Sequence, residues 1–402
     1  PTQIGSILGS SIPQPGLPVS TIDGKPYAWG GIHTPNWSAE LGGDNKLVVT
    51  TMNVNEILKV NILDGLDFQG TLGYSTNNAA RDEQYLSIDW YQYDGTPIQN
   101  ENSPYPAKEK SSYTKSSART DNYTASAFLT YKKLFDEAHD ISLMGGVQYD
   151  YAAYDYSGTK AMDVEASIES LNGKGQIYID KVDRWEEAIL SYFGRMNYNY
   201  KSRYMVEVNA RYDGSSKFPE NSKWGFFPSA SVGWRISEEP FMAGAKSWLD
   251  NLKIRASFGS TGNGQVDNYL FLSKIAIKKN LGFLTGDSPL IYADKPSLIP
   301  DGLTWETVST YDLGLDWEML NGRLSIVADI YRKNTTDMYV VGPELPAVFG
   351  NSAPKGNYAD MRTDGWEASI SWRDNFKLGG KDFSYNLKFA IWDNVTKVTK
   401  YM

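Results

Sequence analysis

Hydrophobic and polar residues alternate with a period of two along most of this chain. Segments 66–75, 204–213 and 383–391 show the alternation most clearly, each with aliphatic or aromatic residues at every second position. This period is typical of β-strands whose two faces meet different surroundings. The best helical candidate is only the short run 240–249. The pattern therefore predicts an all-β, antiparallel structure.

The strand candidates group into six successive hairpins. One of them turns at Asn321-Gly322, where both residue types accept positive φ. The paired segments are 54–63 with 66–75, 120–132 with 140–152, 187–200 with 203–213, 226–236 with 250–260, 305–319 with 323–334, and 364–373 with 382–397. Longer polar segments separate them: 76–119 (with a candidate extra strand at 84–93), 153–186, 214–225, 261–304 and 335–363.

This layout combines short turns at one end with long loops at the other, as in outer-membrane barrels. Strands of about 10 to 14 residues also exceed the five or six that are usual in soluble sheets. We therefore expect a transmembrane β-barrel domain over 1–402, with about 12 to 14 strands. Residues 1–53 are expected to form an extracellular loop and the start of the first strand, and 54–402 the six hairpins with long extracellular loops.

The two faces of the strands carry different chemistry. A barrel in lipid turns its apolar face outward and its polar face toward a wet lumen. The charged residues expected in the lumen are Arg195, Glu207, Arg211, Arg235, Arg255, Asp312 and Glu367. A soluble sandwich would instead bury the apolar face, and alternation alone does not distinguish the two.

Aromatic residues near strand ends favour the membrane interpretation, because outer-membrane barrels carry aromatic girdles at both interfaces. Ordinary β-propensity is the alternative explanation, since Tyr and Trp are common in strands. The candidates on the apolar face are Tyr74, Tyr123, Tyr131, Tyr192, Tyr198, Tyr200, Tyr204, Tyr212, Trp234, Trp317, Trp366 and Trp372.

The amino-acid composition agrees with a β-barrel that has one apolar face and one face exposed to water. The chain of 402 residues has 13% aromatic residues, with 27 Tyr and 12 Trp, and yet a mean hydropathy of -0.45. A formal net charge of -9 argues against a nucleic-acid partner, because phosphate contacts need clustered positive charge. With no Cys and only His33 and His139, no catalytic constellation, metal site or cofactor is expected.

A series of short motifs resembles a known family. They are YFGRMNYNY at 192–200, RYDGSSKF at 211–218, WGFFPS at 224–229, GWRIS at 233–237, LKIRASFG at 252–259, TGN at 261–263, LTWE at 303–306, YDLG at 311–314, YRK at 331–333 and GWE at 365–367. Together, in this order, they resemble the SusC/RagA-type TonB-dependent outer-membrane transporters. The resemblance is closest over about 190–400.

The resemblance implies an active importer in the outer membrane of a Gram-negative bacterium, and not an enzyme. Its implied partners are a SusD-like surface lipoprotein, TonB (through a missing N-terminal part), an oligosaccharide or peptide substrate, and outer-membrane lipid. Family members enclose a plug domain in a barrel of about 22 strands. No plug-like segment is recognised here, and 397–402 looks like the start of a loop. We therefore expect an internal barrel fragment.

Aromatic side chains in the long loops are the candidates for substrate contact. They are Trp37, Trp90, Tyr91, Tyr93 and Trp185. Rings can stack on the apolar faces of sugars or on peptides. Packing within the loops or a place in the aromatic girdle is the alternative explanation. Two other functions stay open on the sequence alone: a passive porin-like barrel, and a soluble carbohydrate-binding β-protein.

Overall fold

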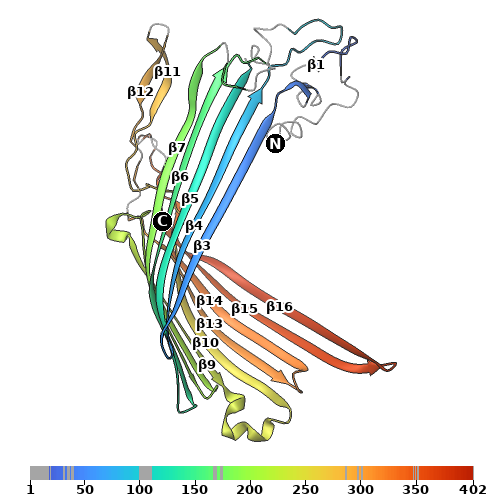
Figure 1. Ribbon diagram of the computed structural model, residues 1–402, viewed down its shortest axis with the longest axis vertical. Helices are drawn as coiled ribbons and strands as arrows, with labels where there is room; N and C mark the ends of the chain where they lie inside the picture. Colours follow the sequence, from blue (N-terminus) through green and yellow to red (C-terminus); the bar gives the residue numbers. More distant parts are fainter. Residues whose placement is uncertain are drawn as a thin grey trace. The chain divides into compact units, whose positions relative to one another are not determined.

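Strands dominate the computed structural model. Twelve of them form one sheet in the order β16-β15-β14-β13-β10-β9-β8-β7-β6-β5-β4-β3, so that neighbours in sequence are neighbours in the sheet (Figure 1). The residues that the structure describes are 18, 20–29, 32–33, 37, 40–98, 111–165, 170–172, 175–285, 288–296, 298–299, 302–346, 348, 350 and 353–401. The all-β prediction, with about 12 to 14 strands, is confirmed.

The twelve strands are β3 (Asn45–Leu63), β4 (Leu66–Tyr85), β5 (Ser112–Phe135), β6 (His139–Met162), β7 (Ile177–Tyr200), β8 (Tyr204–Ser215), β9 (Trp224–Arg235), β10 (Leu249–Asn263), β13 (Glu306–Met319), β14 (Leu324–Val341), β15 (Lys355–Leu378) and β16 (Lys381–Tyr401). Two small pairs lie outside this sheet: β1 (Ala28–Trp29) with β2 (Ile32–His33), and β11 (Ile277–Thr285) with β12 (Ser288–Ala293). Short 3-10 turns are η1 (Glu220–Ser222), η2 (Ile236–Glu238) and η3 (Pro240–Ala245).

Several strands are longer than the sequence predicts. Strands β5, β6, β7 and β15 each have 24 residues, and they extend into the segments expected to be loops. The hairpin β11–β12 lies inside the expected loop 261–304, and β16 continues to Tyr401, where a loop was expected. Hydrophobic and polar residues alternate where one face of a strand meets lipid. Beyond the lipid the backbone ladder continues although both faces can be polar, so the periodicity disappears before the strand ends.

The helical candidate 240–249 is also shorter than expected. Only Pro240–Ala245 is helical, as the 3-10 turn η3. Pro240 at its start has no N–H to pair, and Gly244 near its end weakens a helix, so one tight turn is the natural extent. Among the described residues, no helix has the length and apolar character required to cross a membrane.

The chain divides into two compact units, each with a small hydrophobic cluster. The first contains Pro1–Val54, Tyr74–Tyr123 and Ala152–Glu186, and the second contains Asn55–Gly73, Thr124–Tyr151 and Glu187–Met402. The buried cluster of the first unit is Tyr113, Ala161 and Val164, with Leu171 against it. The buried cluster of the second unit is Phe218, Phe227, Leu303 and Trp305.

Tight turns join the strands at one end of the second unit. Asn321 and Gly322 have φ of 60° and 70°, which confirms the predicted Asn-Gly hairpin. Lys201 and Ser202 have φ of 50° and 55°, a left-handed conformation that is costly for residues with a Cβ. The amide of Lys201 donates to the carbonyl of Ala138 at 2.8 Å. Adjacent turns are therefore tied to one another by backbone hydrogen bonds.

The apolar face of the sheet is uncovered in the second unit. Side chains on this face keep much of their surface accessible, with Phe226 60%, Ile330 59% and Leu387 65% exposed. No second layer covers them among the described residues. Apolar patches of this extent mark contact with a membrane or a partner, which favours the membrane interpretation over the soluble sandwich.

Candidate functional site

The register places all seven predicted lumen charges on one face of the sheet. Opposite residues in a ladder share a face, and so do residues two apart in one strand. Arg195 is opposite Asn209, two residues from Glu207 and Arg211. Glu207 is opposite Ser231, and Ser231 is opposite Ser257. We call the face that carries these residues the polar face.

The remaining predicted charges follow from the same register. Arg235 is opposite Lys253, and the next residue on that face of β10 is Arg255. Arg255 lies opposite Gly314, which is two residues from Asp312 and opposite Asp329. Asp329 in turn is opposite Glu367.

Arg255 is the centre of an ion-pair network on the polar face. Its guanidinium reaches three carboxylates on β13 and β14: Nη2 lies 2.7 Å from Asp329 Oδ1, Nε 3.2 Å from Asp316 Oδ1, and Nη1 3.5 Å from Asp312 Oδ1. The side chain of Asp329 is only 9% exposed. One cation thus compensates three carboxylates, two of which are partly open to solvent.

A glycine makes this network possible. Gly314 lies between Arg255 and Asp329 in the ladder, and a Cβ built on it would overlap both side chains. The guanidinium therefore lies over the backbone of Gly314, where any larger residue would displace it. This position requires glycine for close approach and not for an unusual backbone conformation.

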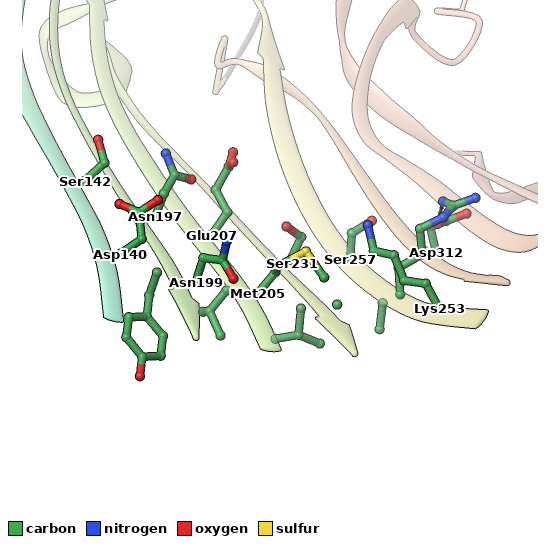
Figure 2. Close-up of a pocket in the computed structure, with 16 residues that line it drawn as sticks. Asp140, Ser142, Asn197, Asn199, Met205, Glu207, Ser231, Lys253, Ser257 and Asp312 are labelled. Carbon is green, nitrogen blue, oxygen red and sulfur yellow. Dashed lines mark hydrogen bonds and ion pairs between the residues drawn. The ribbon is translucent and has the colours of Figure 1, made fainter. Parts of the chain in front are cut away.

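A shallow pocket of about 420 Å³ lies beside this network, over β6 to β10 and β13. Figure 2 shows the labelled polar side chains on these neighbouring strands. Its lining mixes acids, bases, amides and hydroxyls, including Asp140, Asn197, Glu207, Ser231, Lys253 and Arg255. Such a lining can hold a polar group in several orientations. It offers no nucleophile with an adjacent base, and the described residues include no group of three or more His, Asp and Glu placed to hold a metal ion.

A second set of polar contacts ties two apolar-face rings to the connection between β9 and β10. The Tyr204 hydroxyl and the Trp234 indole N–H donate to Glu239 Oε1 at 2.6 and 3.0 Å. Arg203 Nη1 lies 3.8 Å from Glu239 Oε2. The hydrogen bonds from Tyr204 and Trp234 hold the pKa of the Glu239 carboxyl below its ordinary value.

Two of the predicted substrate-contact residues lie together in the first unit. Tyr93 packs edge-to-face against Tyr27 with ring centroids 6.1 Å apart, and Lys25 Nζ lies 4.8 Å from the centre of the Tyr91 ring. The backbone of Tyr91 bonds to Pro26 and Ala28. Tyr93 keeps 51% of its surface exposed, so its ring remains accessible.

The other three candidates are placed elsewhere in the same unit. Trp90 accepts a backbone bond from Ile98 at 2.9 Å, and Trp37 is half-buried in a helical backbone conformation. Trp185 lies within β7, not in a loop as expected, and it stacks on Tyr154 with centroids 5.5 Å apart. Of the two histidines, the side chain of His33 lies outside the described residues, and His139 Nδ1 is 2.8 Å from the Tyr198 hydroxyl.

One aromatic residue on the polar face was missed by the sequence analysis. Trp392 of β16 lies opposite Glu367 and is 68% exposed. The signal was present: Ile391 belongs to the apolar series of 383–391, so the next residue must point to the other side.

Comparison with known proteins identifies the family. The profile described as "TonB dependent receptor-like, beta-barrel" matches residues 154–401, more than half of the chain. The chain belongs to this family. The TonB-dependent receptor P3 of Formosa agariphila is 30% identical over 357 residues, covering 87% of this chain and 33% of that protein. The TonB-dependent receptor SusC of Bacteroides thetaiotaomicron is 31% identical over 215 residues, covering 53% and 21%.

Solved structures show the same barrel wall. The RagAB peptide transporter superimposes with a TM-score of 0.76 at 21% identity, over 94% of this chain and 40% of that one. The RagAB peptide importer in its "open-open" state gives a TM-score of 0.75 at 22% identity, with the same coverage. The present TonB-dependent receptor barrel thus spans about a third of the length of its first curated relatives. Its SusC/RagA-type character is confirmed.

Members of this family are outer-membrane transporters of Gram-negative bacteria and not enzymes. The TonB-dependent receptor barrel has the aromatic residues that such a location requires. On β9, Trp224 and Trp234 lie ten residues apart on the apolar face. At about 3.3 Å per residue this is about 33 Å along the strand. A tilt of about 40° reduces it to about 25 Å, the height of the apolar band in such barrels.

Proposed function

We propose that this chain is part of an active importer of oligosaccharides or peptides, working with a SusD-like surface lipoprotein. The lipoprotein captures the cargo at the cell surface and delivers it to the barrel. TonB supplies the energy through a part of the protein outside this sequence. The outer membrane holds no ATP, so transport against a gradient requires such a mechanical link.

The observation that carries this proposal is the two-faced sheet of a SusC/RagA-type barrel. The apolar face is exposed as a lipid-contacting wall would be, and the polar face presents paired charges and a pocket of about 420 Å³. A polar face of this kind suits a lumen that is wet and that cargo crosses. We propose that Arg195, Glu207, Arg211, Arg235, Arg255, Asp312 and Glu367 face this lumen.

Import is tested in the bacterium that carries the gene. The gene is deleted, restored, or restored in a strain without functional TonB, and uptake of labelled oligosaccharides and peptides is measured. We expect uptake of one cargo class to require both the gene and TonB. Uptake that persists without TonB would instead indicate a passive porin-like barrel.

The lipoprotein partner is tested by purifying the full-length protein with an affinity tag from native outer membranes. We expect a surface lipoprotein encoded beside the gene to copurify in a fixed ratio. Full import activity in a strain that lacks this lipoprotein would refute the two-component arrangement.

We also propose that the aromatic residues of the first unit contact cargo, namely Trp37, Trp90, Tyr91, Tyr93 and Trp185. Tyr93 supports this best, because half of its surface is exposed. Tyr93→Ala should weaken cargo binding by about 3- to 10-fold if its ring stacks on the ligand. Tyr85→Ala is a matched control, since Tyr85 is also exposed, at 42%, and ends β4 in the same unit.

A further inference from the structure

The connection between β9 and β10, residues 236–248, differs from the other turns at its end of the sheet. It contains the 3-10 turns η2 and η3 (Figure 1). The other connections at that end of the second unit have only two to four residues: 64–65, 136–138, 201–203, 320–323 and 379–380. The amide of Leu320 in one of these turns donates to the carbonyl of Trp248 at 2.8 Å. Because short turns mark the periplasmic end of an outer-membrane barrel, the connection belongs to that end.

Hydrogen bonds hold the connection against the apolar face of the sheet. The Glu239 carboxylate accepts hydrogen bonds from the Tyr204 hydroxyl and the Trp234 indole N–H, at 2.6 and 3.0 Å, and both rings lie on the apolar face. Leu249, the first residue after the connection, is opposite Met319 on the same face and is only 3% exposed. Because η2 packs on β10, the connection covers this end of the apolar face.

The connection begins at the border of the apolar band. Trp224 and Trp234 lie about 25 Å apart along the barrel axis when the tilt of the strands is included, and this is the height of the band. Residue 236, where the connection starts, is two positions beyond Trp234. A segment that starts here and lies against the apolar face meets the layer of lipid headgroups and upper acyl chains.

The connection exposes large apolar side chains at this level. Phe241 of η3 is 68% exposed and Trp248 is 44% exposed. Leu320, whose amide is bonded to Trp248, is 42% exposed. The ring of Phe241 has no polar atom that could bond to water, so its exposure at a water-facing turn would be unfavourable. In a lipid interface the same exposure is favourable.

The charged side chains of the connection are compensated by partners. Lys246 Nζ lies 3.4 Å from Glu238 Oε2, and Arg203 Nη1 lies 3.8 Å from Glu239 Oε2. Pairing lowers the cost of moving charges toward an apolar environment. The charges of the connection are therefore compatible with a position beside lipid.

We propose that residues 236–248 form an anchor in the periplasmic leaflet of the outer membrane. Phe241 and Trp248 insert among the phospholipids, and Glu239 holds the segment against the sheet. Interfacial segments bury their apolar side chains about 5 to 10 Å into the boundary between headgroups and acyl chains, where Trp is also enriched. The anchor extends the lipid-contacting face of the barrel beyond its strands. It requires the outer-membrane location alone and is independent of the cargo.

The full-length protein in phosphatidylcholine vesicles provides the test. Phe241→Cys carries the environment-sensitive fluorophore NBD. Ser202→Cys is the matched control, because Ser202 is exposed in the turn between β7 and β8 at the same end of the sheet. The present chain has no Cys, and any cysteine in the rest of the protein is replaced by serine. Lipids with a nitroxide near the glycerol end of one acyl chain should quench the label at 241 at least about 3-fold more strongly than the label at 202.

Two variants of the protein labelled at 241 test the role of Glu239. Glu239→Ala removes the acceptor for Tyr204 and Trp234, and it should reduce the quenching by lipid nitroxide about 2-fold because the segment is no longer held against the sheet. Glu238→Ala is the matched control, since Glu238 is the adjacent carboxylate and pairs with Lys246 inside the connection. It should leave the quenching unchanged. Circular dichroism of each variant shows that the barrel is folded.

Equal quenching of the labels at 241 and 202 by lipid nitroxide would overturn the proposal. Iodide dissolved in the buffer then identifies the reason. Strong quenching by iodide would place residue 241 in water, and protection from both quenchers would show that protein covers it. Unchanged quenching in Glu239→Ala would refute the role of Glu239 in holding the segment.

Discussion

The glycine beneath the arginine network leads to a prediction that can be worked out from the structure. Gly314→Ala adds a Cβ that overlaps the guanidinium of Arg255 and the carboxylate of Asp329. The overlapped atoms on both sides belong to side chains, so the guanidinium and the carboxylate must move apart. We expect the hydrogen bond from Arg255 Nη2 to Asp329 Oδ2, 2.8 Å in the wild-type protein, to be lost together with the ion pair.

The magnitude follows from burial. Disrupting a fully buried ion pair costs about 3 to 5 kcal/mol. Here the side chain of Asp329 is 9% exposed but that of Arg255 is 32% exposed, and the guanidinium keeps two other carboxylates within reach. We reduce the loss to about 2 to 3 kcal/mol for these reasons. Alanine returns about 0.5 to 1 kcal/mol because it restricts the unfolded chain more than glycine does. The net destabilisation is about 2 kcal/mol.

Reversible folding of the full-length protein into lipid vesicles provides the assay. Urea titration gives the free energy of unfolding, and a change in midpoint at constant slope reports stability. Gly259→Ala is the matched control. It is another glycine of the polar face, on β10, and its built Cβ would lie 3.8 Å from Ser229 Cβ, an ordinary contact. This variant should be neutral or slightly stabilised.

A double-mutant cycle identifies the cause. Arg255→Ala alone should be destabilising, because it leaves three aspartates without their cation. In the Arg255→Ala background, Gly314→Ala should lower the free energy of unfolding by at least about 1 kcal/mol less than it does in the wild-type background. Additive effects of the two substitutions, or equal effects of Gly314→Ala and Gly259→Ala, would refute the close-approach reasoning.

Three more outcomes are expected. Glu239 has a lowered pKa in the folded protein, so its stabilising effect is complete above pH 4.5 and is lost as the pH falls through the lower folded pKa. Glu239→Gln should remove this pH-dependent loss of stability from the acid unfolding curve, and Tyr204→Phe should reduce the loss. Replacing Lys201-Ser202 by Asn-Gly should raise the free energy of unfolding by about 1 kcal/mol in urea titrations, because both φ values are positive; no gain would contradict this. Trp305→Ala should lower the free energy of unfolding by about 3 kcal/mol, because Trp305 belongs to the buried cluster of the second unit. Hydrogen exchange should become faster at 264–272 and stay unchanged in β15.

Alternation predicted the faces of the sheet well, because the period of a strand is fixed by its backbone. Once Arg255 and Asp312 are assigned to strands, their common face follows from parity alone. Their pairing does not follow, because it depends on which residue of β13 lies opposite which residue of β10. A shift by two residues would keep every charge on the polar face and would still move Arg255 away from Gly314. The sequence therefore predicted that these charges share one face, and the structure shows which of them form ion pairs.

The ends of the strands were predicted less well, for a related reason. Within the bilayer one face of each strand must be apolar, and this requirement produces the alternation of hydrophobic and polar residues. Outside it, the ladder of β7 continues from Glu187 back to Ile177 with polar residues on both faces. Trp185 was placed in a loop because the pattern had ended there, although the backbone hydrogen bonds had not. An aromatic residue that is assigned to a loop only because alternation has ended there can be misplaced in the same way.

Trp392 shows how far residue type alone can mislead. Its type and its place in a strand match those of Trp366 and Trp372, and β-propensity treats the three alike. The register separates them, since two meet the apolar side and one stands opposite Glu367. The surroundings of the rings differ as well: an indole on the apolar face can serve as a girdle residue, whereas an indole on the polar face lies among charged side chains. The parity of a single residue thus decides whether a tryptophan belongs to the apolar face or to the polar face.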